Sequence, residues 1–192
     1  MITSSQDFTQ IDYLAKGNER QKDAYKTLRS MRLMELLEKF DPLLVGTIPI
    51  QIDLPESDLD IICEVHDFEH FEKHCVSHFQ QYDDFVCSRS TVNGIKRIVV
   101  NFTHLGWPFE IFGQSLPTVQ QNGYRHMVIE YRILQLMGSK GLKYIRELKA
   151  AGFKTEPAFA KLLGLVGDPY MALLQLYDWN DDKLKFLINK AN

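Results

Sequence analysis

The chain has 192 residues, of which 45% are hydrophobic and 24% are charged. This balance is typical of a soluble globular domain, alone or with a helical appendage. The formal net charge of −3 and the lack of a basic tract argue against broad, charge-driven binding of nucleic acid and leave only a local basic pocket open. Every apolar stretch is too short to cross a bilayer, and the segment from Met1 to Asp7 lacks the regions of a signal peptide. We therefore expect no membrane partner.

The first half of the chain is predicted to mix helices and strands. Apolar residues at helical spacing predict one long helix over residues 19–40, which Asp41 and Pro42 would end. A buried strand at 43–45 is followed by a turn-rich connector, and then by a strand over 59–65 whose apolar character indicates a sheet covered on both faces. The next predicted elements are a helix over 67–79 and strands over 85–88, 94–102 and 108–112.

The last third of the chain is predicted to be helical from about Tyr124 onward, in four or five helices with glycines near the breaks. This order of elements favours an α+β fold with a small mixed sheet over a doubly wound fold. We expect a core with its N-terminal helix over residues 1–122 and a helical C-terminal subdomain over residues 123–192.

The three cysteines, Cys63, Cys75 and Cys87, form no Cys-x-x-Cys pair and cannot all pair within one chain. Their neighbours are apolar, so we expect them to be buried as small hydrophobic residues. An odd number of cysteines without ligand spacing is typical of a reduced, cytoplasmic protein.

The most informative motif is Ser57-Asp58-x-Asp60, which begins eleven residues after Gly46 of a Gly46-Thr47 pair. On a strand, alternate residues share one face, so the two aspartates are predicted to lie side by side. Two adjacent carboxylates offer the oxygen ligands that a hard cation such as Mg²⁺ prefers. The alternative is that the Ser-Asp pair only caps a turn at the strand entry.

The stretch from Gly46 to Asp60, with its Gly-Thr, Pro and Ser-Asp-x-Asp blocks, resembles the signature of the nucleotidyltransferase superfamily. Together with blocks at residues 154–160 and 167–170, it is similar to an uncharacterised bacterial family within that superfamily. The resemblance implies a nucleotidyltransferase-like fold, in which a small mixed sheet with flanking helices is joined to a C-terminal helical bundle. It also implies Mg²⁺-dependent transfer of a nucleoside monophosphate from an NTP to a hydroxyl of a small molecule or a protein.

The resemblance also implies roles for individual residues. Asp58 and Asp60 would hold two Mg²⁺ ions, one of which carries the triphosphate of the NTP. Gly46 would let the backbone approach the phosphates, which the Thr47 hydroxyl and nearby amides would bind. Ser57 is a further predicted nucleotide-binding residue.

Glu110 is the predicted third carboxylate of this site. It is an acidic residue inside an otherwise apolar strand, and a buried glutamate requires a partner or a bound cation. Glu64 is a weaker choice because it stands four residues after Asp60, roughly 13 Å away at about 3.3 Å per residue. The alternative role of Glu110 is structural, as the partner of a nearby basic residue.

Basic residues are required to neutralise the phosphates of an NTP. The basic residues that the sequence offers are Lys96, Arg97, Arg125, Arg132 and Lys154. We select Arg125, on the first C-terminal helix, as the predicted phosphate contact. His126 and Glu130 stand four residues apart on the same helix, and we expect them to form an ordinary pair.

Two residues depart from the superfamily pattern. Gln51 stands where small nucleotidyltransferases have a second glycine, and Ile50 stands where a basic residue is often found. Both changes favour an alternative function, in which a catalytically degenerate protein of the same fold binds a nucleotide or a metal ion without turnover. The sequence leaves the acceptor, the preferred base and the oligomeric state open.

A row of histidines, each four residues from the next, offers a third interpretation. Adjacent members of such a row meet on a helix and could share Zn²⁺ or Ni²⁺, as in a metal sensor. Each step drifts by about 40° around a helix, so the four side chains do not converge, and a polar helix edge is the favoured explanation of the row. The row comprises His66, His70, His74 and His78.

Overall fold

The computed structural model describes residues 6–191, so most of the segment from Met1 to Asp7, for which we expect no signal peptide, lies outside the described residues. At the centre of the fold is a five-stranded mixed sheet with the order β1-β2-β5-β4-β3. Strands β2 and β5 are parallel, and the other neighbours are antiparallel. The strands are β1 (Leu43–Val45), β2 (Leu59–Glu64), β3 (Asp83–Val92), β4 (Ile95–His104) and β5 (Trp107–Gln114).

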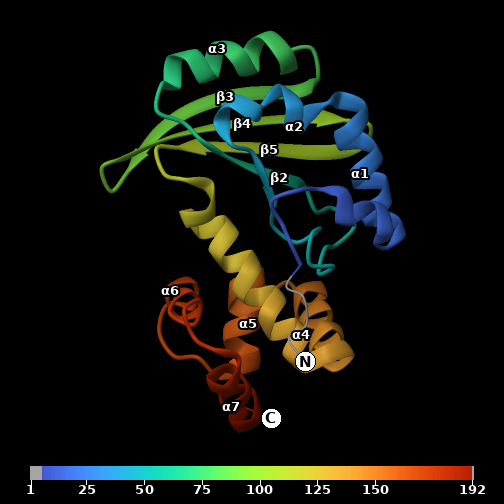
Figure 1. The fold of residues 1–192 in the computed structure, drawn as a ribbon, viewed down its shortest axis with the longest axis vertical. Helices are drawn as coiled ribbons and strands as arrows, with labels where there is room; N and C mark the ends of the chain where they lie inside the picture. The colour runs from blue at the N-terminus through green and yellow to red at the C-terminus, as the bar shows by residue number, and fades with distance from the viewer. Residues whose placement is uncertain (1–5, 192) are drawn as a thin grey trace.

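Helices lie on both sides of the sheet (Figure 1). They are α1 (Glu19–Met31), α2 (Leu33–Leu36), α3 (Phe68–Phe79), α4 (Asn122–Ala150), α5 (Thr155–Leu163), α6 (Pro169–Leu174) and α7 (Asp181–Ala191). Short 3₁₀ helices occupy Asp12–Lys16, Glu38–Phe40 and Thr118–Gln120. Helices α1 to α3 cover one face, whereas α4 to α7 lie beyond the other face (Figure 1).

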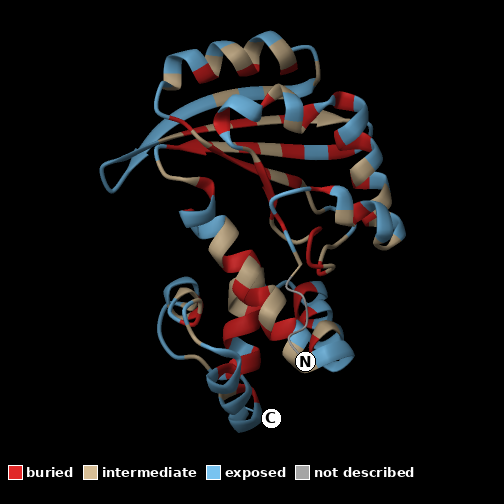
Figure 2. Ribbon diagram, in the orientation of Figure 1, coloured by how far each residue is buried: buried red, intermediate tan, exposed pale blue. Residues whose placement is uncertain are grey.

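The buried residues form two hydrophobic cores, one on each side of the sheet (Figure 2). Leu59 and Ile61 of β2 belong to the core under α1 to α3, whereas Ile62 belongs to the core under α4 and α5. Strand β2 is therefore buried on both faces, which confirms the reading of its apolar run. The predicted α+β fold with a small mixed sheet and flanking helices is also confirmed.

The single long helix predicted over residues 19–40 is wrong. The chain leaves α1 at Arg32, which adopts a left-handed conformation with φ of 53°, and then forms α2 and a 3₁₀ turn. This break lets Leu33 and Leu37, both fully buried, turn into the core beside the sheet. No glycine or proline marks the break, so helical spacing alone could not reveal it.

The hairpin of β3 and β4 is longer than predicted. Strand β3 has ten residues instead of four, because its polar residues pair with β4 while their side chains stay exposed. Helix α4 has 29 residues and is interrupted at Gly138, whose φ of 62° and ψ of −152° are not helical. Its first residues pack against β1 and β2, where a Cβ on Gly123 would lie 3.5 Å from Val45.

None of the helices in residues 6–191 is long and apolar enough to cross a membrane. All three cysteines are free thiols; Cys63 and Cys75 are buried as predicted, and Cys87 is partly exposed. Burial raises the pKa of each thiol, as expected for cysteines that serve as packing residues.

Candidate functional site

The parallel pairing of β2 with β5 places Asp60 directly beside Glu110. Residues in register on neighbouring strands point to the same face, so both carboxylates lie on the side of the sheet that faces α4. The same register places Val45 of β1 beside Asp60, and Asn101 of β4 beside Glu110. Two residues that are fifty positions apart in the chain thus become neighbours through one strand pairing.

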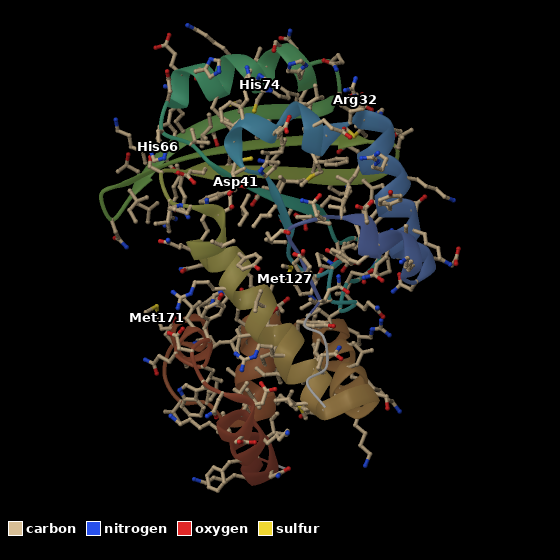
Figure 3. The ribbon with its side chains drawn as sticks, in the orientation of Figure 1. Arg32, Asp41, His66, His74, Met127 and Met171 are labelled. Atoms are coloured by element: carbon tan, nitrogen blue, oxygen red, sulfur yellow. The ribbon has the colours of Figure 1, made fainter. Side chains whose placement is uncertain are left out.

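A cleft with a volume of about 510 Å³ opens on this face of the sheet. Four of the predicted site residues, Gly46, Thr47, Asp60 and Glu110, line it together. Helices α4 and α5 form the opposite wall, and Met127 of α4, labelled in Figure 3, faces the cleft from there. The structure therefore brings the Gly-Thr pair, the second aspartate and the predicted third carboxylate to one place.

The carboxylates of Asp58, Asp60 and Glu110 interact electrostatically. Burial, followed by the charges of Asp58 and Glu110, raises the pKa of Asp60 to about 8, although the nearby Lys149 opposes the shift. Burial and the charge of Asp58 also raise the pKa of Glu110. Asp58 does not line the cleft, but its charge reaches both carboxylates that do.

The carboxylate oxygens of this cluster are the type of ligand that a divalent cation binds. Within the described part of the chain, no group of three or more His, Cys, Asp or Glu side chains is arranged so that it could hold a metal ion as it stands. The pKa of Asp60 is raised first by burial and then by the charges of Asp58 and Glu110, so a bound cation would favour its ionised form. Carboxylate oxygens are the ligands that Mg²⁺ prefers. These residues therefore fit Mg²⁺ in their chemistry, and binding requires their side chains to draw together.

Gly46 is required by the position of Asp60. Its φ of 81° favours glycine, and a Cβ at this residue would overlap Asp60 Oδ2. The Thr47 hydroxyl donates to Ser57 Oγ at 3.3 Å, and Ser57 Oγ also accepts from the backbone N–H of Leu54 at 2.9 Å. The hydroxyls of the motif thus tie the two ends of the β1–β2 connector together.

Helix α4 supplies basic residues to this connector. Gln51 has a φ of 62°, the conformation for which glycine is usually needed, and its carbonyl accepts from Arg146 Nε at 2.9 Å. Burial raises the pKa of Asp53, and the charges of Arg20, Arg146 and Lys149 oppose that shift. Basic side chains of α1 and α4 therefore lie close to the β1–β2 connector, although residues 46–58 include no lysine or arginine.

Lys149 is a site residue that sequence reasoning missed. It is only 8% exposed, and its Nζ donates to Thr155 Oγ1 at 2.8 Å. Burial lowers its pKa, whereas the charges of Glu130, Glu156 and Asp58 act in the opposite direction. No motif marks this lysine, because its position depends on how α4 folds back after Gly138.

The predicted pair of His126 and Glu130 is wrong. His126 Nδ1 lies 3.4 Å from Glu156 of α5, and its Nε2 lies 3.0 Å from the carbonyl oxygen of Tyr170. Glu130 is 3% exposed, and burial followed by the charge of Glu156 raises its pKa well above the usual value. The pairing runs between helices because α5 packs across α4 at this point.

Unpartnered polar atoms gather in the cleft. Among residues 6–191, five buried side-chain nitrogen or oxygen atoms lack a hydrogen-bond partner, and three of them belong to the cleft residues Arg97, Gln121 and Glu130. The side-chain amide of Gln121 donates to the carbonyls of Cys63 and Leu116, both at 2.9 Å, which leaves Oε1 as a free acceptor. Arg97 Nε remains a free donor. Such atoms are costly unless a ligand or water satisfies them.

Arg125, the predicted phosphate contact, does not line the cleft. Its guanidinium lies 4.7 Å from the ring centre of Tyr177 and 3.9 Å from Asp178. Arg132 donates to the carbonyl of Tyr177 and also stays outside. Of the basic residues considered from the sequence, Arg97 is the one that lines the cleft.

His70, His74 and His78 lie on α3, on the other side of the sheet from the cleft, whereas His66 precedes that helix (Figure 3). His66 pairs with Glu64 at 2.7 Å, and His74 Nε2 donates to the carbonyl of Leu36 at 2.8 Å. The rings of His74 and His78 lie 4.6 Å apart. His70 and His74 thus pack α3 against the segment after α1, and none of these four histidines lines the cleft.

The family model described as "Domain of unknown function (DUF4269)" matches residues 26–176 of the sequence. The chain belongs to this family. No protein with a curated description matches the DUF4269 chain. The matched residues include the connector, both aspartates, Glu110 and the whole of α4.

Solved structures resemble the DUF4269 chain in fold. The Cid1 poly(U) polymerase with MgGTP bound has a TM-score of 0.55 and 11% identity, over 83% of this chain and 57% of that one. A second Cid1 structure, described for RNA terminal uridylyl transferase activity, has a TM-score of 0.55 and 12% identity, over 86% of this chain and 58% of that one. The DUF4269 chain thus spans less than two thirds of these polymerases. The similarity confirms a nucleotidyltransferase-like fold.

Proposed function

We propose that this protein is a Mg²⁺-dependent nucleotidyltransferase, which moves a nucleoside monophosphate from an NTP to a hydroxyl group. The observation that carries the proposal is the half-buried Asp60, which lies beside Glu110 in the cleft and is within electrostatic reach of Asp58. Strongly perturbed carboxylates in a cleft are typical of a functional site.

The metal ligands in this proposal are Asp58, Asp60 and Glu110. Bound Mg²⁺ would supply charge stabilisation for the attacking and leaving oxygens of the transfer. The protein contributes two rigid, hydrogen-bonded strands, which keep Asp60 and Glu110 adjacent. The same strands limit the distance by which the carboxylates can separate when they repel one another.

The triphosphate end of the NTP would lie against the β1–β2 connector. Gly46 leaves room for the Asp60 carboxylate, and the hydroxyls of Thr47 and Ser57 offer hydrogen bonds. Arg146 and Lys149 would supply the positive charge that the phosphates require. These two residues of α4 replace Arg125 in that role.

The nucleoside end would extend along the sheet toward Arg97 and Gln121. Arg97 pairs with Gln114, which stands four residues after Glu110, roughly 13 Å along the strand at about 3.3 Å per residue. Phe112 lies between them on the same face and provides an apolar floor for a ring. The free Oε1 of Gln121 and Nε of Arg97 offer one acceptor and one donor to the nucleoside.

The acceptor hydroxyl would approach Glu110. A carboxylate whose pKa is raised by burial and by a neighbouring charge is a better general base near neutral pH than an ordinary glutamate. The similar structures are described as a poly(U) polymerase and an RNA terminal uridylyl transferase. The net charge of −3 supports a small molecule or a protein as the acceptor in preference to a long RNA.

A second candidate function is binding without turnover. It is favoured by Ile50, which is buried and cannot contact a phosphate. Against it, Arg146 reaches the carbonyl of the adjacent Gln51, so the positive charge that the connector lacks comes from α4. This compensation supports an active enzyme.

The test is a pyrophosphate-release assay with Mg²⁺ and each of the four NTPs, in the presence of panels of hydroxyl-bearing small molecules and proteins. We expect release with at least one NTP, and none from a variant with both Asp58→Ala and Asp60→Ala. Thermal stabilisation by an NTP without release would instead identify a binding protein.

A further inference from the structure

The first turns of α1 hold the connector that leads into the aspartate motif. Gln21 Nε2 donates to the carbonyls of Ile48 and Pro49, at 3.0 and 3.1 Å. Arg20 Nη2 donates to the carbonyl of Pro55 at 2.7 Å and to that of Ser57 at 3.3 Å. Four backbone carbonyls of a connector without regular strands are thus bound by two adjacent side chains.

The same arginine also contacts β5. The Arg20 guanidinium lies 3.9 Å from the ring centre of Trp107, which is fully buried and stands three residues before Glu110. The indole N–H of Trp107 donates to Asp23 of α1 at 2.9 Å, which keeps the ring in place under the guanidinium. Because Ser57 directly precedes Asp58, one planar group joins the two chain segments that carry the three carboxylates.

The positive charge of Arg20 acts on Asp53 and not on the pKa of Asp60. Its Nε lies 3.6 Å from Asp53, and Arg20 is among the charges that oppose the raised pKa of Asp53. The charges that shift the pKa of Asp60 come instead from Asp58, Glu110 and Lys149. The effect of Arg20 on the cluster is therefore geometric. It depends on the flat, forked shape of a guanidinium, which a lysine cannot reproduce.

We propose that Arg20 is a positioning residue, which sets the place of Asp58 relative to Glu110 by clamping the connector onto Trp107. The consequence for turnover rests on the proposed nucleotidyl transfer, whereas the clamp itself does not. A misplacement of about 1 Å in a reacting group lowers the rate by as much as ~10²-fold.

The first test compares Arg20→Lys with Arg29→Ala in the Mg²⁺-dependent assay. Arg29 is on the same helix but pairs with Glu35, so its removal is a matched control. We expect Arg20→Lys to lower kcat by about 10- to 100-fold with little change in the KM for the NTP. A kcat equal to that of the wild type would overturn the proposal.

The second test needs no turnover and therefore separates the clamp from the proposed function. Amide hydrogen exchange is measured on the wild type, Arg20→Lys and Arg29→Ala. We expect faster exchange over residues 53–60 and 107–110 in Arg20→Lys alone, while the rest of the sheet keeps its protection. Unchanged exchange in these two segments refutes the clamp even if the enzyme is active. Faster exchange in a protein that shows no turnover with any NTP leaves the clamp standing and counts against the proposed function.

Discussion

The side chains on the two sides of the cleft are positioned in different ways. On the sheet wall, Asp60 and Glu110 occupy hydrogen-bonded strands and share a register, so their adjacency follows from backbone pairing. On the helical side, Glu130 lines the cleft, whereas Lys149 lies outside the lining and belongs to the other part of an interrupted helix. A strand pair fixes side chains within a few ångströms, whereas a packed helix fixes them only as well as its contacts do. We therefore expect the sheet wall to be decisive for chemistry and the helical wall to be decisive for binding.

The strongest way to test this contrast is Asp60→Asn. The substitution keeps the shape of the side chain but removes a charged ligand from the sheet wall. We expect turnover to fall by at least about 10²- to 10³-fold, with the protein still folded by circular dichroism. Residual turnover within tenfold of the wild type would show that the cluster is not the reaction centre.

The same carboxylate predicts a dependence of stability on pH. Since the pKa of Asp60 is about 8 in the folded protein and 3.8 in the unfolded chain, the folded state retains the proton in between. The free energy of unfolding is then lowered as pH rises from about 4 to 8. The difference between these two pKa values corresponds to an upper value of about 5 kcal/mol, which local relaxation reduces.

Denaturant unfolding of Asp60→Asn and the wild type across this pH range measures the effect. The variant is expected to gain relative stability toward pH 8, while Asp182→Asn, at an exposed carboxylate in the first turn of α7, gains none. Addition of Mg²⁺ at pH 8 is expected to stabilise the wild type and not Asp60→Asn. A stability difference that does not vary with pH contradicts the raised pKa.

On the helical side, Lys149→Ala tests the contribution to binding. We expect kcat/KM for the NTP to fall about 10- to 100-fold, through the loss of a charge that would neutralise the phosphates in the proposed function. Arg125→Ala is the matched control, because Arg125 lies against Tyr177 outside the cleft. An equal loss of kcat/KM in Lys149→Ala and Arg125→Ala would mean that Arg125 also contacts the phosphates.

Glu130→Gln is expected to have the smallest effect. Burial raises the pKa of Glu130 and so favours its protonated form, and a neutral amide of the same shape should therefore change the free energy of unfolding by less than about 1 kcal/mol. Thermal unfolding at pH 7 checks this, with Glu130→Leu as the comparison that also removes the polar atoms of the side chain. A large loss in Glu130→Gln would mean that an ionised Glu130 is needed.

The parts of the site that the sequence could predict are those that depend on local spacing. Gly46, Thr47 and Asp60 stand close together in the chain, and Glu110 is conspicuous as an acid in an apolar strand. Lys149 was missed because its place depends on the interruption of α4 at Gly138 and on the packing of α5, which no local pattern encodes. The break at Arg32 was hidden for a related reason, since tertiary packing of two buried leucines overrides helical spacing.

The parallel register of β2 and β5 has a consequence for how this protein can change in evolution. Alternate residues of β5 point to opposite faces, so one residue inserted between Trp107 and Glu110 would send the carboxylate into the hydrophobic core under α1 to α3. Two inserted residues would keep its face but carry it past Asp60. The tight turn at Leu105 and Gly106, outside the paired strands, carries no such restriction. Length variation in this family is therefore expected to collect in the turns and to spare the few residues that lead to Glu110.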